Sequence, residues 1–312
     1  MKIHTHDATN YPSENALLTG VWKLCDPKIS MASISSMFLG TCLAATSGSI
    51  DLMWLALTVI GILSLEAAKN ASGEVYDYDS GADLAVSDED QSPYSGGKRV
   101  IVDGLMSRKQ TIVSGAIFYL IGITIGLFIF SQREPAILII GIAGVLLAFF
   151  YHAPPVKLSY RGFGEITVAT VYGPMICCGT FLVQCNEVSA EAIFLSIPLG
   201  VLIAAFLVIN EFPDRKADLS AHKMNLVVRL GVQKSNWLFF SLIATAYLGI
   251  VLLPLAGLTT NVWLGLIGLP FGLRAARRLQ SIRQTCEIIP AQRWTLYSFC
   301  LAAFGCGTGL LL

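Results

Sequence analysis

The sequence predicts an all-α membrane protein, a polytopic bundle of nine transmembrane helices arranged as two four-helix halves plus a ninth helix. Of its 312 residues, 54% are hydrophobic and 13% are charged, against roughly 25% charged residues in an ordinary soluble domain. The mean hydropathy is +0.65. A chain this apolar and this poor in charge is typical of a membrane protein.

Nine apolar runs approach the roughly 17 to 25 residues that a helix needs to cross a bilayer. The run at 136–152 is short and the run at 261–279 contains Pro270, so eight helices is the alternative. None of the runs alternates as barrel strands do, and a backbone in lipid must satisfy its own polar groups, so each run is predicted to be helical. The runs cover residues 29–47, 50–69, 110–131, 136–152, 164–185, 190–210, 236–257, 261–279 and 292–312.

The charges in the loops predict the orientation, because Lys and Arg concentrate in cytosolic loops. With nine helices and a cytosolic N-terminus, 20 of the 21 Lys and Arg residues fall on the cytosolic side, and only Arg133 falls outside. The acidic residues divide into 17 inside and 4 outside. Residues 1–28 are then a polar cytosolic tail without the apolar core of a signal peptide, and residues 29–312 form one transmembrane domain.

Two groups of acidic and amide side chains stand where predicted helices reach the cytosol. Residues at i, i+4 and i+7, or at i, i+4 and i+8, share one face of a helix, so each group points one way. Carboxylates near hydrocarbon are costly and usually functional. The first group is Asn70, Glu74, Asp77 and Asp83, and the second is Asn210, Asp214 and Asp218.

Opposed carboxylates repel one another, so a cation between the two groups is expected. Mg²⁺ is typically held by one or two carboxylates together with substrate phosphates, and nearby bases can bind the remaining phosphate oxygens. The metal would stabilise a diphosphate as it leaves an allylic carbon, with an isoprenoid tail among the helices. Tyr76, Tyr78, Tyr151 and Tyr160 could shield the resulting cation, although interface anchoring is the commoner role of such tyrosines. The candidate bases are Lys98, Arg99, Lys157 and Arg161.

Two long loops, 70–109 and 211–235, follow equivalent helices, and Asn70-x3-Glu74 matches Asn210-x3-Asp214 in position. The match predicts a weak internal repeat with a site between its halves. In the first loop, Ser95-Gly96-Gly97 supplies flexible backbone beside two bases, which predicts a lid over an anionic ligand. A solvated loop is the alternative. The four histidines are scattered, and none has ligand spacing with another.

The motifs N-x3-E-x2-D-x5-D at 70–83 and INEFPDRKADLSAHKMNLVVRLG at 209–231 resemble the two aspartate-rich motifs of the UbiA superfamily of intramembrane prenyltransferases. SPYSGGKRVIVDGL and FYHAPPVKLSYRGFGE are most similar to the branch that prenylates 1,4-dihydroxy-2-naphthoate in menaquinone synthesis. The resemblance spans about residues 20–310 and implies one UbiA-like prenyltransferase domain over 29–312. One residue departs from the pattern, because Glu74 stands where the family usually shows Asp.

The resemblance implies Mg²⁺ as cofactor, and a prenyl diphosphate and an aromatic acceptor as substrates within the lipid bilayer. It implies metal and diphosphate ligation by both groups of acidic and amide side chains, with Asp77 and Asp214 foremost. It further implies substrate binding by Lys98, Arg99, Lys157, Tyr160 and Arg161. The active site would face the cytosol, at the inner membrane if the cell is bacterial. No nucleic acid and no obligate protein partner is expected.

Three alternatives stay open at this point. The acceptor could be 4-hydroxybenzoate or homogentisate, although the R-T-x-x-R-P that usually follows the first motif in the hydroxybenzoate and haem-farnesylating branches is absent. A cation-coupled secondary transporter also carries intramembrane carboxylates, but there they lie at breaks near the midplane. An alcohol phosphatidyltransferase would show a D-G-x-x-A-R signature, which the sequence lacks.

Overall fold

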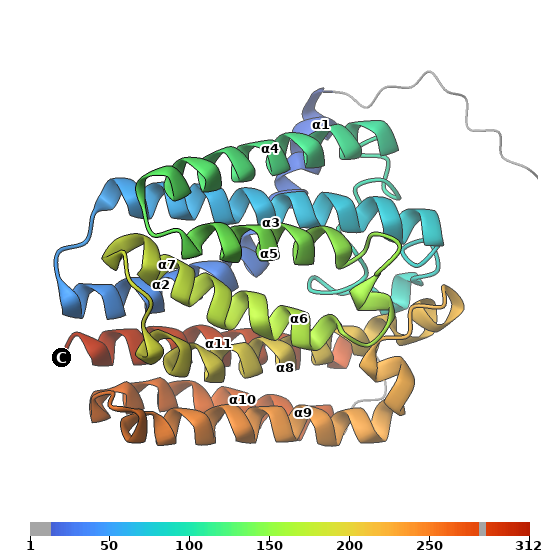
Figure 1. Ribbon diagram of the computed structural model, residues 1–312. Helices are drawn as coiled ribbons and strands as arrows, with labels where there is room; N and C mark the ends of the chain where they lie inside the picture. Colours follow the sequence, from blue (N-terminus) through green and yellow to red (C-terminus); the bar gives the residue numbers. More distant parts are fainter. Residues whose placement is uncertain (1–13, 281–284) are drawn as a thin grey trace, which may run out of the picture.

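The fold is known from a computed structural model that describes residues 14–280 and 285–312. Within these ranges the secondary structure is helical and contains no β-strand, so the predicted all-α class is confirmed. The helices run side by side as one bundle (Figure 1). The α-helices are α1 Glu14–Cys25, α2 Pro27–Ser47, α3 Leu52–Ser80, α4 Arg108–Gln132, α5 Ala136–Phe150, α6 Gly164–Thr170, α7 Ile176–Cys185, α8 Ala190–Ser220, α9 Leu226–Leu252, α10 Leu269–Leu279 and α11 Ile289–Leu310. The short turns are η1 Asp88–Asp90, η2 Leu158–Tyr160, η3 Val171–Met175, η4 Leu253–Ala256, η5 Thr260–Gly268 and η6 Thr285–Glu287.

Each of the nine predicted apolar runs falls on helical structure in the described part of the chain. Six helical segments are long and apolar enough to cross a membrane by themselves, and α5 is a shorter apolar helix. The chain is therefore an integral, multi-pass membrane protein. The number of nine spans and the cytosolic N-terminus stay predictions.

Three runs predicted as single helices are interrupted, and each contains a proline. The run at 236–257 passes from α9 into the 3₁₀ turn η4, which contains Pro254. The run at 164–185 divides into α6, a π-helical turn η3 that contains Pro174, and α7. The run at 261–279 divides into a 3₁₀ segment η5 and α10, which begins around Pro270. Proline has no backbone N–H and its ring clashes with the preceding turn, which favours a break at these positions. A break is not obligatory, because α8 continues through Pro198 and Pro213.

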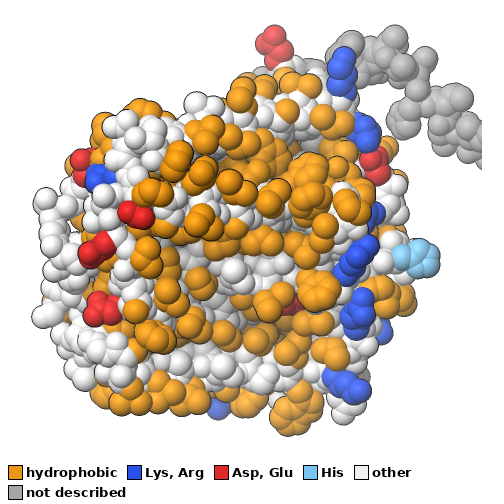
Figure 2. Space-filling model, viewed as in Figure 1, with side chains coloured by type: hydrophobic (Ala, Val, Ile, Leu, Met, Phe, Trp, Pro, Cys, Tyr) orange, Lys and Arg blue, Asp and Glu red, His pale blue; other side chains and the backbone are white. Residues whose placement is uncertain are grey.

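Helices α3 and α4 pack against each other, as do α8 and α9, which hold equivalent places in the two predicted halves. In Figure 1 the loops after α3, α5 and α8 all lie at the right-hand end of the bundle. In Figure 2 apolar side chains fill the middle of the visible face, and most of the visible Lys and Arg lie along that same right-hand edge. The long loop after α3, the connections after α5 and α8, and most of the visible basic charge therefore share one end of the bundle. The prediction of a second long loop at 211–235 is wrong, because α8 continues to Ser220 and α9 begins at Leu226.

Part of the predicted N-terminal tail is ordered helix. Helix α1 packs against α3, and the carbonyl of Leu24 accepts a hydrogen bond of 2.8 Å from Asn70 Nδ2. Leu24 is buried in a small apolar cluster with Ala71, Val100 and Met106. Residues 1–13 of the predicted tail lie outside the described residues. Helix α1 thus supports the start of the first acidic motif, and the domain boundary at residue 28 stays a prediction.

Candidate active site

A polar cavity of about 200 Å³ lies between α3 and α8 at the loop end of the bundle. Its remaining wall includes the backbone of Gly96 and Gly97 and three lysine side chains. Both acidic motifs therefore reach one cavity. Of the seven side chains predicted as ligands, six line it: Asn70, Glu74, Asp77, Asn210, Asp214 and Asp218.

The length of α3 and α8 brings these side chains to the cavity. Helix α3 has 29 residues and α8 has 31, so each is about 45 Å long at 1.5 Å per residue, longer than the roughly 30 Å apolar core of a bilayer. Helix α3 ends where Gly81 adopts a left-handed φ of 82°, a conformation that glycine adopts readily. Both helices are thus long enough to extend beyond the apolar core of a bilayer. On each helix the acidic and amide side chains at the predicted spacing reach the same cavity.

Glu74 is already bonded to the loop that follows α3. Its Oε1 accepts from the backbone N–H of Lys98 and, at 3.1 Å, from that of Arg99. Its Oε2 accepts from Val100 N at 2.9 Å. Across the cavity, Asp214 Oδ2 accepts from Gly96 N at 2.9 Å. Residues 96–100 therefore form a strap that joins the two acidic motifs through backbone N–H groups.

We expect Glu74→Asp to loosen this strap, because the side chain one methylene shorter no longer reaches three N–H donors. Hydrogen bonds to charged groups contribute roughly 1.5–3 kcal/mol each, so KM for the prenyl diphosphate should rise about tenfold. The half-saturating Mg²⁺ concentration should stay within twofold in the same assay. A raised Mg²⁺ requirement with an unchanged KM would instead identify Glu74 as a metal ligand, as the sequence predicted.

Asp77 is the centre of a buried charge network. Its Oδ1 accepts from Tyr160 OH at 2.7 Å, and its Oδ2 lies 3.1 Å from Lys223 Nζ. Lys223 also lies 3.6 Å from Asp218 Oδ1, so one cation bridges both motifs. Burial alone would lower the pKa of Lys223, but the carboxylates of Asp218 and Asp77 outweigh it and raise the pKa well above its ordinary value.

Lys223 and His152 are site residues that the sequence analysis missed. His152 Nε2 lies 3.9 Å from Asp77 Oδ2, and its ring covers Gly73, where a Cβ would be 2.8 Å from the imidazole. Both residues line the polar cavity. Lys223 could have been predicted as a site residue from its position between Asp218 and Asn225 in the second motif, because a base there neutralises the acids around it. His152 carries no comparable signal in the sequence.

Among the seven predicted ligands, three buried oxygens have no hydrogen-bond partner: Asn210 Oδ1 and Asp214 Oδ1 in the cavity wall, and Asp83 Oδ2 outside that wall. Glu211 Oε2, which the sequence analysis did not consider, also lies in the wall without a partner. Burial, together with the charges of Asp77 and Glu74, raises the pKa of Asp83 to about 9. Unsatisfied buried oxygens are costly unless a ligand completes them. Among the described residues, however, no three acidic, His or Cys side chains come close enough together to hold a metal ion by themselves.

The predicted substrate-binding residues divide into two sets. Lys98 lines the cavity, and its ammonium pairs with Asp26. Tyr160 reaches the site through its bond to Asp77. In contrast, Arg99 bonds to Asp103 and to the carbonyl of Asp83, and it is not part of the cavity wall.

Lys157 and Arg161 also lie outside the cavity wall. Lys157 Nζ lies 4.7 Å from the centroid of the Tyr160 ring, and the exposed Arg161 bonds to the carbonyl of Pro155. Of the four tyrosines considered as cation shields, Tyr151 lines the cavity, whereas Tyr76, Tyr78 and Tyr160 do not. The structure thus brings Lys98, Tyr151 and Tyr160 to the site and leaves Arg99, Lys157 and Arg161 at its margin.

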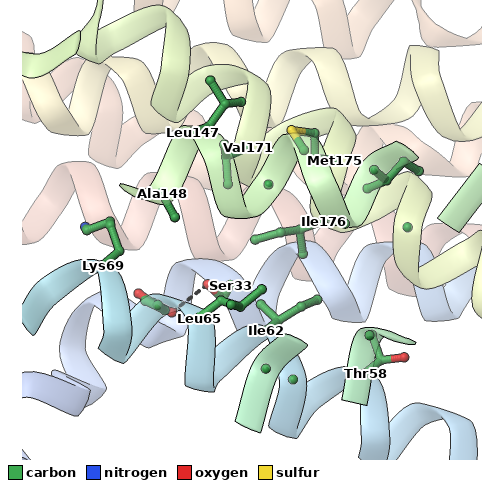
Figure 3. A pocket seen from close by; sticks show the side chains of 18 of the residues that line it. Ser33, Thr58, Ile62, Leu65, Lys69, Leu147, Ala148, Val171, Met175 and Ile176 are labelled. Atoms are coloured by element: carbon green, nitrogen blue, oxygen red, sulfur yellow. Dashed lines mark hydrogen bonds between the residues drawn. The ribbon is translucent and has the colours of Figure 1, made fainter. Parts of the chain in front are cut away.

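An apolar chamber, also of about 200 Å³, lies deeper in the bundle between α3, α4, α5 and the α6–α7 segment. Figure 3 shows aliphatic side chains such as Ile62, Val171 and Ile176 pointing into it, with Lys69 at one end and Thr58 at the other. Four residues line both the chamber and the polar cavity: Lys69, Tyr151, Val168 and Tyr172. The two spaces therefore share a wall.

Comparisons with known proteins agree with this architecture. The model of the UbiA prenyltransferase family matches residues 33–304. A 1,4-dihydroxy-2-naphthoate octaprenyltransferase from Bacillus subtilis is 25% identical over 303 residues, which cover 96% of this chain and 95% of that protein. A UbiA prenyltransferase domain-containing protein from Dictyostelium discoideum is 28% identical over 74% of this chain and 70% of its own length.

Solved structures show the same fold. The apo structure of a UbiA homolog from Aeropyrum pernix superposes with a TM-score of 0.66 at 15% identity, covering 88% of this chain and 95% of that one. A UbiA homolog from Archaeoglobus fulgidus bound to GPP and Mg²⁺ superposes with a TM-score of 0.62 at 14% identity, covering 93% and 98%. From its motifs, its fold and the match along most of its length, the chain belongs to the UbiA prenyltransferase family.

Proposed function

We propose that this prenyltransferase uses Mg²⁺ to transfer a polyprenyl group from a prenyl diphosphate to 1,4-dihydroxy-2-naphthoate, as a step of menaquinone biosynthesis. The observation that carries the proposal is the shared wall between the polar cavity and the apolar chamber. A prenyl diphosphate has a charged head and a long apolar tail. With the head in the cavity and the tail in the chamber, its reactive allylic carbon would lie at Lys69, Tyr151, Val168 and Tyr172.

The side chains of the cavity fit Mg²⁺. The unpartnered oxygens of Asn210 and Asp214 in the wall, and of Asp83 behind Gly97, are the hard donors that this ion prefers. Mg²⁺ usually takes only one or two carboxylates and completes its shell with water and substrate phosphates. The acidic side chains of the two motifs lie too far apart to hold a metal ion by themselves among the described residues. This separation agrees with a Mg²⁺ site that needs the oxygens of the diphosphate to be complete. The homolog from Archaeoglobus fulgidus binds GPP together with Mg²⁺.

The chemistry needs little acid–base work from the protein. Mg²⁺ would supply stabilisation of the negative charge on the departing diphosphate. The electron pair of the broken carbon–oxygen bond leaves with the diphosphate, and the acceptor ring supplies the pair for the new carbon–carbon bond. Loss of the ring carboxylate as carbon dioxide returns a pair to the ring. Asp77 and Asp214 would hold the metal, and the strap at 96–100 would exclude water from the allylic cation.

The acceptor is inferred from relatives. The similar protein from Bacillus subtilis, which matches over nearly the full chain, is a 1,4-dihydroxy-2-naphthoate octaprenyltransferase, and so is a 27% identical relative from Mycobacterium tuberculosis. The alternative acceptors are 4-hydroxybenzoate and homogentisate. Membership of a prenyltransferase family speaks against a cation-coupled transporter.

The orientation is likewise part of the proposal. The polar cavity opens among the loops after α3, α5 and α8, at the end of the bundle where most of the visible Lys and Arg lie (Figure 2). Because basic loops stay in the cytosol, we place the active site on the cytosolic face, which in a bacterium is that of the inner membrane.

The direct test uses membranes that contain the protein, a polyprenyl diphosphate and each acceptor separately, with the product identified by its mass. We expect decarboxylated, prenylated product from 1,4-dihydroxy-2-naphthoate, and a loss of at least 100-fold in rate when EDTA removes the metal. Added Mg²⁺ should restore the rate. Product from 4-hydroxybenzoate or homogentisate alone would refute the naphthoate acceptor, and full activity in EDTA would refute the metal requirement.

A further inference from the structure

Three lysines line the polar cavity, and two of them already have acidic partners. Lys223 pairs with Asp77 and Asp218, and Lys98 pairs with Asp26. Lys69 takes part in no ion pair with any residue that the structure describes. An unpaired ammonium inside a membrane bundle is costly, and such residues usually meet an anion in the working protein.

Lys69 stands where the two spaces meet. It lines both the cavity and the chamber, and Figure 3 shows it at the end of the apolar chamber. Its Nζ lies 5.7 Å from the centroid of the Tyr151 ring, which belongs to the same shared wall. Of the four residues that line both spaces, Lys69 is the one with a charged side chain, and it is held beside an aromatic ring.

The carboxylate of Glu66, one turn before Lys69 on α3, also lines the apolar chamber but is already bonded to two hydroxyl groups. Glu66 Oε2 accepts from Ser33 Oγ at 2.7 Å, and its Oε1 accepts from Tyr172 OH at 3.1 Å. Both oxygens thus have hydroxyl partners, and Glu66 forms no ion pair with Lys69 among the described residues. Lys69 is left available to an anion that enters the shared wall.

We propose that Lys69 binds the carboxylate of the aromatic acceptor, and that the enzyme therefore selects acceptors of the aromatic carboxylate class. The inference rests on the proposed function, which puts the allylic carbon at the shared wall. An acceptor must bring its ring to that carbon. Lys69 would hold the carboxylate at the ring edge, while Tyr151, Val168 and Tyr172 supply flat and apolar surfaces for the ring.

The diphosphate is the less suitable partner for Lys69. The diphosphate of the prenyl donor already has other binding groups in this proposal, namely the two acidic motifs with their metal and the backbone N–H groups of the strap. Lys98 and Lys223 also lie near it, because they line the polar cavity and not the chamber. Lys69 alone among these lysines also borders the apolar chamber. A cation at this position is suited to the second substrate, which has to approach between head and tail.

The experiment compares two competitive inhibitors that differ only in the carboxylate, 1-hydroxy-2-naphthoate and 1-naphthol, in membranes of the wild type and of Lys69→Met. In the wild type the carboxylate should bind more tightly. In Lys69→Met, we expect KM for dihydroxynaphthoate and Ki for hydroxynaphthoate to rise about 10- to 100-fold, the range for losing one charged hydrogen bond. Ki for naphthol and KM for the prenyl diphosphate should stay within threefold.

Two variants complete the comparison. Lys69→Arg keeps the charge and should recover most of the carboxylate selectivity. Lys109→Met removes an exposed lysine at the start of α4 and should change nothing. Equal loss for both inhibitors, no carboxylate preference in the wild type, or a raised KM for the prenyl diphosphate would each overturn the assignment.

Failure of the inference is separable from failure of the proposed function. If the wild type prenylates none of the three acceptors, the proposed function fails. If it prenylates 4-hydroxybenzoate only, the naphthoate acceptor fails, and the same comparison with 4-hydroxybenzoate and phenol still decides the role of Lys69.

Discussion

Asp77→Asn is expected to lower kcat about 1000-fold. The substitution keeps the size of the side chain but removes the charge that faces Lys223 and Tyr160. It also removes a carboxylate that we assign to the metal, and loss of one stabilising group at a developing negative charge typically costs about 3–4 kcal/mol of barrier. Turnover should be measured at saturating Mg²⁺ and prenyl diphosphate, with the amount of protein in the membrane determined in parallel.

Asp79→Asn is the matched control for this variant. Asp79 lies two residues further along α3, but its carboxylate makes exposed bonds of 2.9 and 2.7 Å to Arg108. Exposed ion pairs contribute about 0–1 kcal/mol, so this variant should keep its activity within twofold. If Asp77→Asn retained more than a tenth of wild-type turnover, Asp77 could not be a principal ligand of the metal.

That six of the seven predicted ligands share one cavity could be predicted from the sequence, because their arrangement is local. Their role as ligands stays a prediction. A helix fixes which residues share a face, so the spacing of Asn70, Glu74 and Asp77 determines a common direction whatever surrounds the helix. All three side chains are buried and line one cavity. The same reasoning holds for Asn210, Asp214 and Asp218 on α8.

The residues that sequence reasoning missed depend on contacts between distant segments. Lys223 meets Asp77 across 146 positions of the chain. Neither its distance nor its partner can be read from helical periodicity. For the same reason, one of the predicted bases does not reach the site. Arg161 is close to it in sequence, but its side chain points away and bonds to the carbonyl of Pro155. The nearby motif indicated that the loop after α5 lies beside the site, but it could not indicate in which direction the side chains of this loop point.

The role of Glu74 also depends on tertiary structure. In the sequence it reads as a metal ligand, because it occupies an aspartate position of the family motif. In the fold, the strap at 96–100 turns three N–H groups onto its carboxylate. The left-handed φ values of 80° at Gly96 and 73° at Gly97 allow this turn. The extra methylene of Glu74 thus has a structural use that no local pattern reveals.

Gly97→Ala is expected to lower kcat/KM for the prenyl diphosphate about 100-fold. A Cβ at this position would lie 2.6 Å from both carboxylate oxygens of Asp83, which is itself buried. The clash forces the strap outward, and its N–H groups would then lose their bonds to Glu74 and Asp214, each of which contributes roughly 1.5–3 kcal/mol. Steady-state kinetics with varied prenyl diphosphate measures the effect.

Gly104→Ala separates this clash from simple backbone strain. Gly104 lies in the same loop with a similar φ of 68°, but a Cβ there would meet nothing within 4 Å. A left-handed alanine costs about 1 kcal/mol, so this variant should lose less than tenfold. Equal losses in the two variants would mean that strain alone explains the result. A much larger loss in Gly97→Ala would show that the strap must close against Asp83 for the enzyme to bind its diphosphate, since of these two variants Gly97→Ala alone places a methyl group against a carboxylate of the site.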